Sequence, residues 1–212
     1  MGAMFRLRAA AGLVGPAAFT AAWVAAARRQ DGYRVAHEHI SGLAARDAAG
    51  RGLMSAGFLA LGACTIAFSS ELERRLGGGR RAGWGPALMG LAGVGTVAAG
   101  LFPRDRRLNA APGEPEEQSW VNDVHDAASM AGALAGLVGL VALARRFSGD
   151  PTWGDLAAPA ARTAAIGGAS TAWFLRDVIR PGNGIVQRVS VSVPLAFMAR
   201  LARRTLTARA AR

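Results

Sequence analysis

Lysine is absent from the sequence, and Cys64 is its single cysteine. All 25 basic side chains are therefore arginines. Without a lysine the chain cannot form the Schiff base that retinal, pyridoxal phosphate or an aldolase substrate requires, so no retinal protein is expected. A single cysteine excludes a small secreted domain that is held together by disulfides.

Familiar catalytic motifs are missing as well. The sequence contains no HExxH, CxxC, GxSxG or GxxxxGK pattern, each of which would have pointed to a known enzyme class. The three glycines at 77–79 precede two arginines and no lysine, so this segment is expected to be a loop. Whether the chain is an enzyme stays open on the sequence alone.

Long stretches without charge dominate the sequence, although its net charge is +11. Disorder is excluded because 51% of the residues are hydrophobic, whereas disordered chains combine high charge with low hydrophobicity. The arginines cluster between the uncharged stretches, as they do beside membrane spans. We therefore expect a membrane protein and no nucleic-acid partner, since membrane flanking already accounts for the basic charge.

Six stretches are predicted to cross the membrane as helices, because a hydrocarbon core of about 30 Å needs about 20 apolar residues. They cover residues 9–27, 52–70, 83–102, 127–144, 157–175 and 184–202. These spans leave no room for a separate soluble domain, so residues 1–212 are predicted to form a single polytopic all-α domain. The first stretch has an alternative interpretation as a cleaved signal peptide, with small residues at 25–27.

The connection between the first two spans has its own pattern. Ala36, Ile40, Leu43 and Ala44 recur at helical spacing, which predicts an amphipathic helix over residues 33–49 in the headgroup plane.

The arginines predict that both termini are cytoplasmic. With that orientation 13 arginines fall in inner segments and 11 in outer ones, and Arg162 lies within the fifth span. The arginine-dense tail from Arg200 to Arg212 decides the assignment, because arginine is retained on the cytoplasmic side.

Small residues at four-residue spacing permit close approach of spans in lipid. They occur on the first, third and fourth spans, and the fourth contains Gly132 and Gly136 as a GxxxG pair. Packing within one monomer and a homodimer through the fourth span are both open.

Three groups of segments resemble the bacterial membrane family catalogued as domain of unknown function 998. They are Asp31-Gly32-Tyr33 with His39-Ile40-Ser41 and Leu43; Gly100-Leu101-Phe102-Pro103-Arg104-Asp105 with Val124-His125-Asp126; and Gly184-Ile185-Val186-Gln187-Arg188-Val189. The resemblance runs from about residue 11 to residue 206. It implies a multipass protein of the bacterial inner membrane and brings no assigned activity.

The polar residues of these segments fall on one predicted side of the membrane, which packing alone does not require. They form the candidate ligand-binding site: Tyr33, His39, Ser41, Asp105, His125, Asp126, Gln187 and Arg188. The leading hypothesis is an outward-facing polar pocket that binds a lipid headgroup or another amphiphile, with membrane lipids as partners. Arg188 would hold an anionic group such as a phosphate.

Other functions and a structural role remain open for the same residues. His39, His125 and Asp126 carry the nitrogen and oxygen ligands that zinc prefers, so the chain could be a metal-dependent lipid hydrolase. A small transporter would need an ionisable residue or an interruption of a helix inside the membrane. Arg162 and Pro194 are the candidates for these two features. The chain could also be a subunit of a membrane complex, or the site residues could simply cap helices. No haem site is expected, because no predicted span interior contains a histidine.

Overall fold

The computed structural model is an all-α protein, as predicted, and no strand occurs in the residues it describes, which are 2–106, 119–176 and 182–207. Its long helices are α1 (Ala3–Arg29), α2 (Arg51–Arg75), α4 (Gly85–Leu101), α5 (Trp120–Phe147), α6 (Ala157–Arg176) and α7 (Asn183–Thr207). The short helices η1 (Ser41–Ala44), α3 (Gly79–Ala82) and η2 (Gly154–Leu156) lie in the connections. Arg107, Arg180, Arg209 and Arg212, which the orientation prediction counted, lie outside the described residues.

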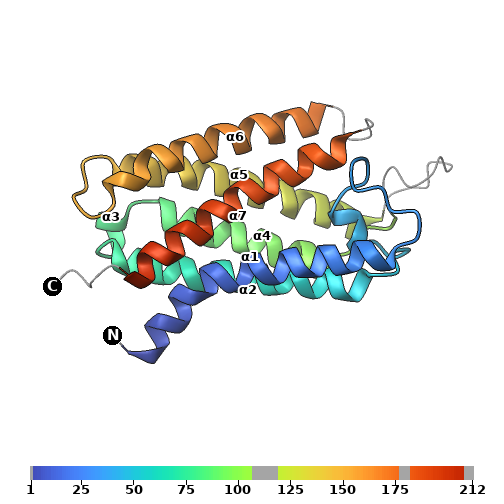
Figure 1. Cartoon of the computed structure of the whole chain (residues 1–212), viewed down its shortest axis with the longest axis horizontal. Coiled ribbons are helices and arrows are strands. Elements are labelled where there is room, and N and C mark those ends of the chain that lie inside the picture. Colours follow the sequence, from blue (N-terminus) through green and yellow to red (C-terminus); the bar gives the residue numbers. More distant parts are fainter. Residues whose placement is uncertain (1, 107–118, 177–181, 208–212) are drawn as a thin grey trace.

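The six long helices form a closed ring. Each packs on the next in the order α1, α2, α4, α5, α6 and α7, and α7 returns to pack on α1. Successive helices run in opposite directions, so both termini lie at one end of the bundle (Figure 1). We call this the terminal end. The opposite end carries the connection from α1 to α2 and the beginnings of α5 and α7, and with them His37, His39 and His125; we call it the histidine end.

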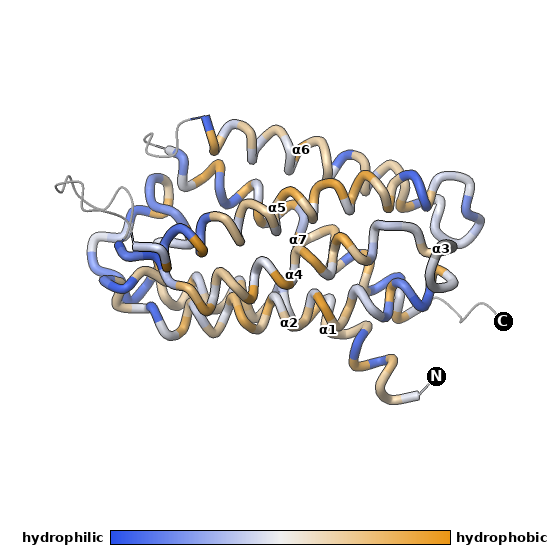
Figure 2. The backbone as a smooth tube through the Cα atoms, turned by 180° about the vertical axis from the view of Figure 1, so that it is seen from behind, coloured by the Kyte–Doolittle hydropathy of each residue, from blue (hydrophilic) through white to orange (hydrophobic). Residues whose placement is uncertain are grey.

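An apolar band separates the two ends. Figure 2 shows hydrophilic residues gathered at each end and hydrophobic residues along the helices between them. Helices α1, α2, α5 and α7 are long and apolar enough to cross a membrane, and α4 is a shorter apolar helix of 17 residues. The chain is therefore a multipass membrane protein. That α4 and α6 also cross the bilayer stays a prediction.

Small residues bring the helix backbones together, as the four-residue spacing predicts. A Cβ added at Gly57 would lie 2.6 Å from the Cβ of Ala22, which joins α2 to α1. A Cβ at Gly132 would lie 3.2 Å from the carbonyl oxygen of Ala92, which joins α5 to α4. Gly136 also faces Ala92. The surface that a homodimer through the fourth span would use is therefore packed against α4 of the same chain.

The prediction of an amphipathic surface helix over 33–49 is wrong. This connection consists of turns and the single short helix η1, and Ile40, Leu43 and Ala44 are buried in the protein core. Side chains of α7 form hydrogen bonds with the backbone of this connection. The Gln187 Oε1 atom accepts from the Ile40 N–H at 2.6 Å, and Arg188 donates to the carbonyls of Val35 and Glu38. These bonds replace the helical ones, so the segment folds over the end of the bundle.

Candidate functional site

The structure places all eight predicted site residues at the histidine end. They form two groups. Tyr33, His39 and Ser41 of the connection lie against Gln187 and Arg188 of α7. Asp105 follows α4 and meets the start of α5, where His125 and Asp126 lie in the first two turns.

Arg188 ties the connection to α7. Its Nη1 atom donates to the carbonyls of Val35 at 2.6 Å, Glu38 at 2.9 Å and Gly184 at 2.9 Å, and its Nη2 atom donates to the Tyr33 hydroxyl at 2.7 Å. The guanidinium also lies 5.2 Å from the centre of the Trp23 ring. These contacts occupy both terminal nitrogen atoms of the guanidinium that was predicted to hold a phosphate, and only its buried Nε has no hydrogen-bond partner among the described residues. Arg188 therefore acts as a structural clamp.

The other residues of this group are also held by the protein. The Tyr33 hydroxyl donates to the carbonyl of His39 at 3.0 Å, and Gln187 donates to the Ser41 hydroxyl at 3.4 Å. The His39 side chain is buried, with its ring edge-on to Phe174 at a centroid distance of 4.9 Å. His37, on the same connection, accepts from the Gly182 N–H at 3.0 Å. Together they close the end of the bundle between α1 and α7.

Asp105 caps the start of α5. Its carboxylate accepts from the Ser119 N–H at 2.8 Å and from the Ser119 hydroxyl at 2.7 Å, and it pairs with Arg46 at 3.4 Å. The backbone hydrogen bond from Ser119, then the bond from its hydroxyl, hold the pKa of Asp105 below its ordinary value. Ser119 is the N-cap of α5 and accepts from the Asn122 N–H. The carboxylate thus stays ionised and fixes the loop that enters the helix.

Asp126 is paired within the protein as well. It accepts from the Arg104 guanidinium at 3.1 Å and from the Asn122 amide at 3.2 Å. Arg104 is mostly buried, and desolvation is the larger influence on it, so its pKa is lowered although Asp126 and Asp105 oppose that shift. Arg104 therefore depends on these two carboxylates for its charge balance.

His125 fastens α5 to the end of α4. Its side chain is 1% exposed, and its Nδ1 atom lies 2.9 Å from the carbonyl oxygens of both Ala99 and Phe102. Two neighbouring acceptors require a hydrogen on Nδ1, so in the neutral ring Nε2 is left as an acceptor. Nε2 has no hydrogen-bond partner among the described residues. The ring lies edge-on to Phe58 at a centroid distance of 6.1 Å.

The three predicted zinc ligands do not form a metal site. No group of three or more His, Cys, Asp or Glu side chains that could hold a metal ion occurs in the described part of the chain, which includes His39, His125 and Asp126. His125 faces α4 and Phe58, whereas His39 faces Phe174. Asp126 accepts a hydrogen bond from Arg104. The hydrolase alternative loses the metal centre on which it depended.

A cavity of about 250 Å³ lies at the centre of the ring, and sequence reasoning did not predict it. All six long helices contribute to its wall, which is mostly apolar and includes Phe19, Leu61, Leu137, Leu140 and Met198. Pro194 of α7 lines it, whereas Arg162 of α6 is exposed and does not. The two features invoked for a transporter are therefore not in one place.

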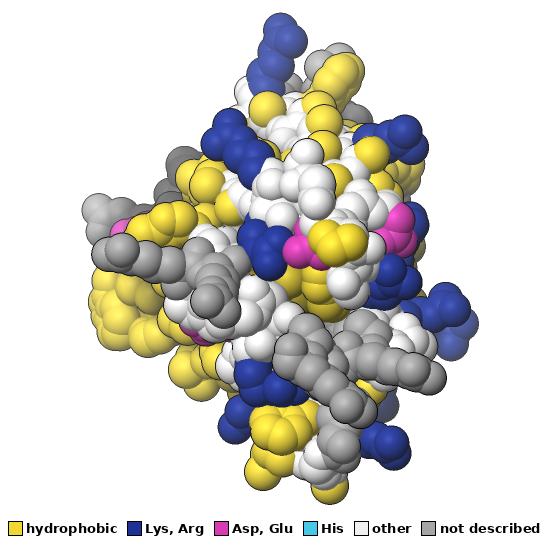
Figure 3. Space-filling view, turned by 90° about the vertical axis from the view of Figure 1, so that its left-hand side faces the viewer, with side chains coloured by type: hydrophobic (Ala, Val, Ile, Leu, Met, Phe, Trp, Pro, Cys, Tyr) yellow, Lys and Arg dark blue, Asp and Glu magenta, His cyan; other side chains and the backbone are white. Residues whose placement is uncertain are grey.

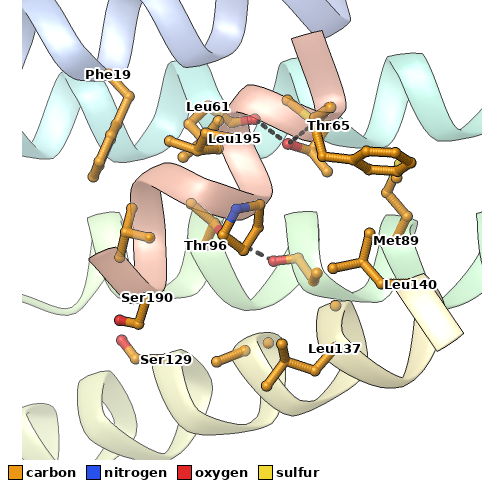
Figure 4. Close-up of a pocket in the computed structure, with 18 of the residues that line it drawn as sticks. Phe19, Leu61, Thr65, Met89, Thr96, Ser129, Leu137, Leu140, Ser190 and Leu195 are labelled. Atoms are coloured by element: carbon orange, nitrogen blue, oxygen red, sulfur yellow. Dashed lines mark hydrogen bonds between the residues drawn. The ribbon is translucent and has the colours of Figure 1, made fainter. Parts of the chain in front are cut away.

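Hydroxyl groups are distributed unevenly along this cavity. Four of the five hydroxyl residues that line it, Thr96, Ser129, Thr171 and Ser190, belong to the halves of their helices that lie nearer the histidine end. Thr65, the fifth, lies with Met89, Leu140 and Met198 in the half nearer the terminal end, where its hydroxyl donates to the carbonyl of Leu61 at 2.8 Å. Figure 4 shows Ser129 and Ser190 on one side of the cavity and Met89 and Leu140 on the other. Thr96 and Ser190 donate to carbonyls of their own helices, so their oxygens can still accept. Most of the hydroxyl groups of the cavity therefore lie in its half nearer the histidine end.

Sequence reasoning also missed Arg46, Arg104 and Glu38, which hold the predicted residues in place. Arg46 and Arg104 are joined by a backbone hydrogen bond of 2.9 Å, although 58 positions separate them in the chain. No local sequence pattern predicts such a long-range contact. Arg104 stands inside the segment that carried the family resemblance, and its position directly before Asp105 was the one available signal.

The family model described as "Protein of unknown function (DUF998)" matches residues 13–204, which is most of the chain. No match was found in the curated proteins or in the solved structures that were compared.

Proposed function

The chain belongs to DUF998, a family of unknown function, and we propose that it binds a neutral amphiphile of the membrane in its central cavity. The apolar chain of the ligand would lie toward the terminal end, and its headgroup toward the histidine end. The observation that carries this proposal is the gathering of four of the five hydroxyl residues of a mostly apolar cavity in its half nearer the histidine end.

The size of the cavity supports an occupant. An apolar cavity of about 150 Å³ already binds benzene, and this cavity of about 250 Å³ approaches the volume of about 300 Å³ at which small-molecule sites begin. A single alkyl chain with a small headgroup is the class of ligand that fits.

The chemistry of the wall supports an uncharged headgroup. Every residue that lines the cavity is neutral, and its polar groups are hydroxyls, so an ionised headgroup would find no counter-charge there. His125 stands one helical turn from Ser129, on the histidine side, and its buried Nε2 is a further acceptor at this end. A hydroxyl-bearing lipid, such as a fatty alcohol or a monoacylglycerol, is the class we assign to the cavity.

Filling the cavity should remove the ligand. Ala133 lines the cavity on α5, whereas Ala131, two residues away, does not. A phenylalanine at 133 should lower the amount of neutral lipid that co-purifies by about ten-fold, because overpacking opposes the ligand by about 1–3 kcal/mol. Mass spectrometry of lipids extracted from purified Ala133→Phe and Ala131→Phe measures this. Equal retention in both variants and the unchanged protein would contradict the proposal.

We also propose that the terminal end faces the cytoplasm. Arginines gather around this end (Figure 3), among them Arg74, Arg145, Arg146 and Arg203, which fits the retention of arginine inside the cell. In a Cys64→Ser background, Asp31→Cys at the histidine end should react with a membrane-impermeant maleimide in intact spheroplasts. Thr207→Cys should react only after lysis, and the reverse pattern would overturn the orientation.

A further inference from the structure

A second hollow lies between α5 and α6, toward the terminal end. This α5–α6 groove has a volume of about 520 Å³. Its walls are the side chains of Leu137, Val138, Val141, Ala144 and Arg145 on α5 and of Ala161, Ala164 and Ala165 on α6. Three alanines on α6 leave the space that larger side chains would fill. Apart from Arg145, the whole lining is apolar.

Arg145 differs from the arginine that follows it. Arg146 donates to Asp150 at 2.6 Å and to the Leu76 carbonyl at 3.3 Å. Arg145 is exposed and has no hydrogen bond or ion pair with any residue that the structure describes. It stands in the last turn of α5, where a long cationic side chain reaches the headgroup level of a bilayer. The groove therefore begins at a cation that the protein does not neutralise.

We propose that the α5–α6 groove binds an anionic phospholipid, with its phosphate on Arg145 and an acyl chain between α5 and α6. A guanidinium binds phosphate oxygens with two parallel hydrogen bonds. From Arg145 to Leu137 the groove follows eight residues of helix, which is about 12 Å at 1.5 Å per residue. That length accommodates the upper part of an acyl chain. The lipid comes from the leaflet at the terminal end.

The groove and the central cavity meet at one side chain. Leu137 lines both, and it packs beside Gly167 of α6, where an added Cβ would lie 2.9 Å from the leucine. The phospholipid thus lies one side chain away from the ligand of the cavity. The two sites nevertheless differ in headgroup chemistry, because the groove offers a cation and the cavity offers hydroxyls. The groove site does not depend on the function proposed for the cavity.

The test compares lipids of opposite headgroup character. The purified full-length chain in detergent is titrated with dioleoyl phosphatidylglycerol or with dioleoyl phosphatidylcholine, and bound lipid is counted by native mass spectrometry. The anionic lipid should bind at least about ten-fold more tightly, as a charge-assisted hydrogen bond provides. Arg145→Gln should abolish that preference. Arg203→Gln, which removes an exposed arginine from the last turns of α7 at the same end, should keep it.

Two further arms decide between a lipid and a free anion. Ala165→Phe should weaken binding of both lipids by filling the groove, whereas Ala169→Phe, one turn along α6 and outside the groove, should not. Inorganic phosphate at millimolar concentration should leave phosphatidylglycerol bound, and displacement by phosphate would overturn the assignment to a lipid. An unchanged preference in Arg145→Gln would overturn the site itself.

Retention of neutral lipid in the central cavity should be the same in Arg145→Gln as in the unchanged protein. Failure of the groove proposal is therefore distinguishable from failure of the cavity proposal.

Discussion

Replacing Arg188 by alanine should lower the free energy of unfolding by about 3–6 kcal/mol, because the equivalent of about two charge-assisted hydrogen bonds of about 1.5–3 kcal/mol each is lost. Four oxygen atoms accept from this guanidinium, three of them backbone carbonyls. Truncation leaves the Val35 carbonyl without this donor and leaves Glu38 with the longer bond from the Tyr33 hydroxyl at 3.3 Å. The connection that carries His37 and His39 should then be held to α7 less firmly, through bonds such as that of Ile40 to Gln187.

Thermal unfolding in detergent, followed by tryptophan fluorescence, measures this loss. Arg200→Ala is the matched control, since it removes an exposed arginine from the same helix. Arg188→Lys should recover only part of the stability, because one ammonium cannot span acceptors on both sides of the guanidinium fork. If Arg188→Ala and Arg200→Ala unfold at the same temperature, Arg188 does not clamp the connection.

The helices were predictable because uncharged runs are the direct consequence of a lipid environment. Each predicted window falls on one long helix, and five of the six helices extend beyond their windows: α5 begins at Trp120, seven residues before its window, and α2 ends at Arg75, five residues after. The exception is α4, Gly85–Leu101, which is shorter than its window of 83–102. Hydrogen bonding along a helix does not stop at the edge of the hydrocarbon. The N-cap Ser119 sets the start of α5, and it belongs to a polar segment that hydropathy cannot assign.

The candidate residues were predictable, but their roles were not. Family resemblance found Arg188, His125 and Asp105, and all three lie at one end of the bundle. Their partners are mostly backbone groups far away in the chain: Arg188 binds the carbonyl of Val35 across 153 positions. Every residue has a backbone carbonyl, so the sequence does not indicate which carbonyl will accept a hydrogen bond. For the same reason the polar pocket was expected where the structure has a closed network of hydrogen bonds.

Gly62 marks a close approach of two helices, which small-residue spacing did not find. A Cβ there would lie 2.7 Å from the carbonyl oxygen of Gly93 and 2.8 Å from the backbone nitrogen of Val97, so α2 and α4 are in direct backbone contact. Backbone atoms cannot rotate away as a flexible side chain can. In lipid, where apolar burial gives no advantage between helices, such contacts are a principal source of association.

Gly62→Val should therefore lower the free energy of unfolding by about 3 kcal/mol, at the upper end of the usual effect of overpacking. Gly62→Ala, which adds only the Cβ, should lower it by about 1–2 kcal/mol and keeps the comparison measurable if the valine variant fails to fold. Gly52 is the matched control, because it lies on the same helix and a Cβ there meets nothing within 4 Å. Gly52→Ala should not lower stability, since the added Cβ meets nothing and alanine favours a helix over glycine. Thermal unfolding of the three variants in detergent gives these differences, and a Gly62→Ala protein as stable as Gly52→Ala would show that α2 and α4 do not meet at this backbone contact.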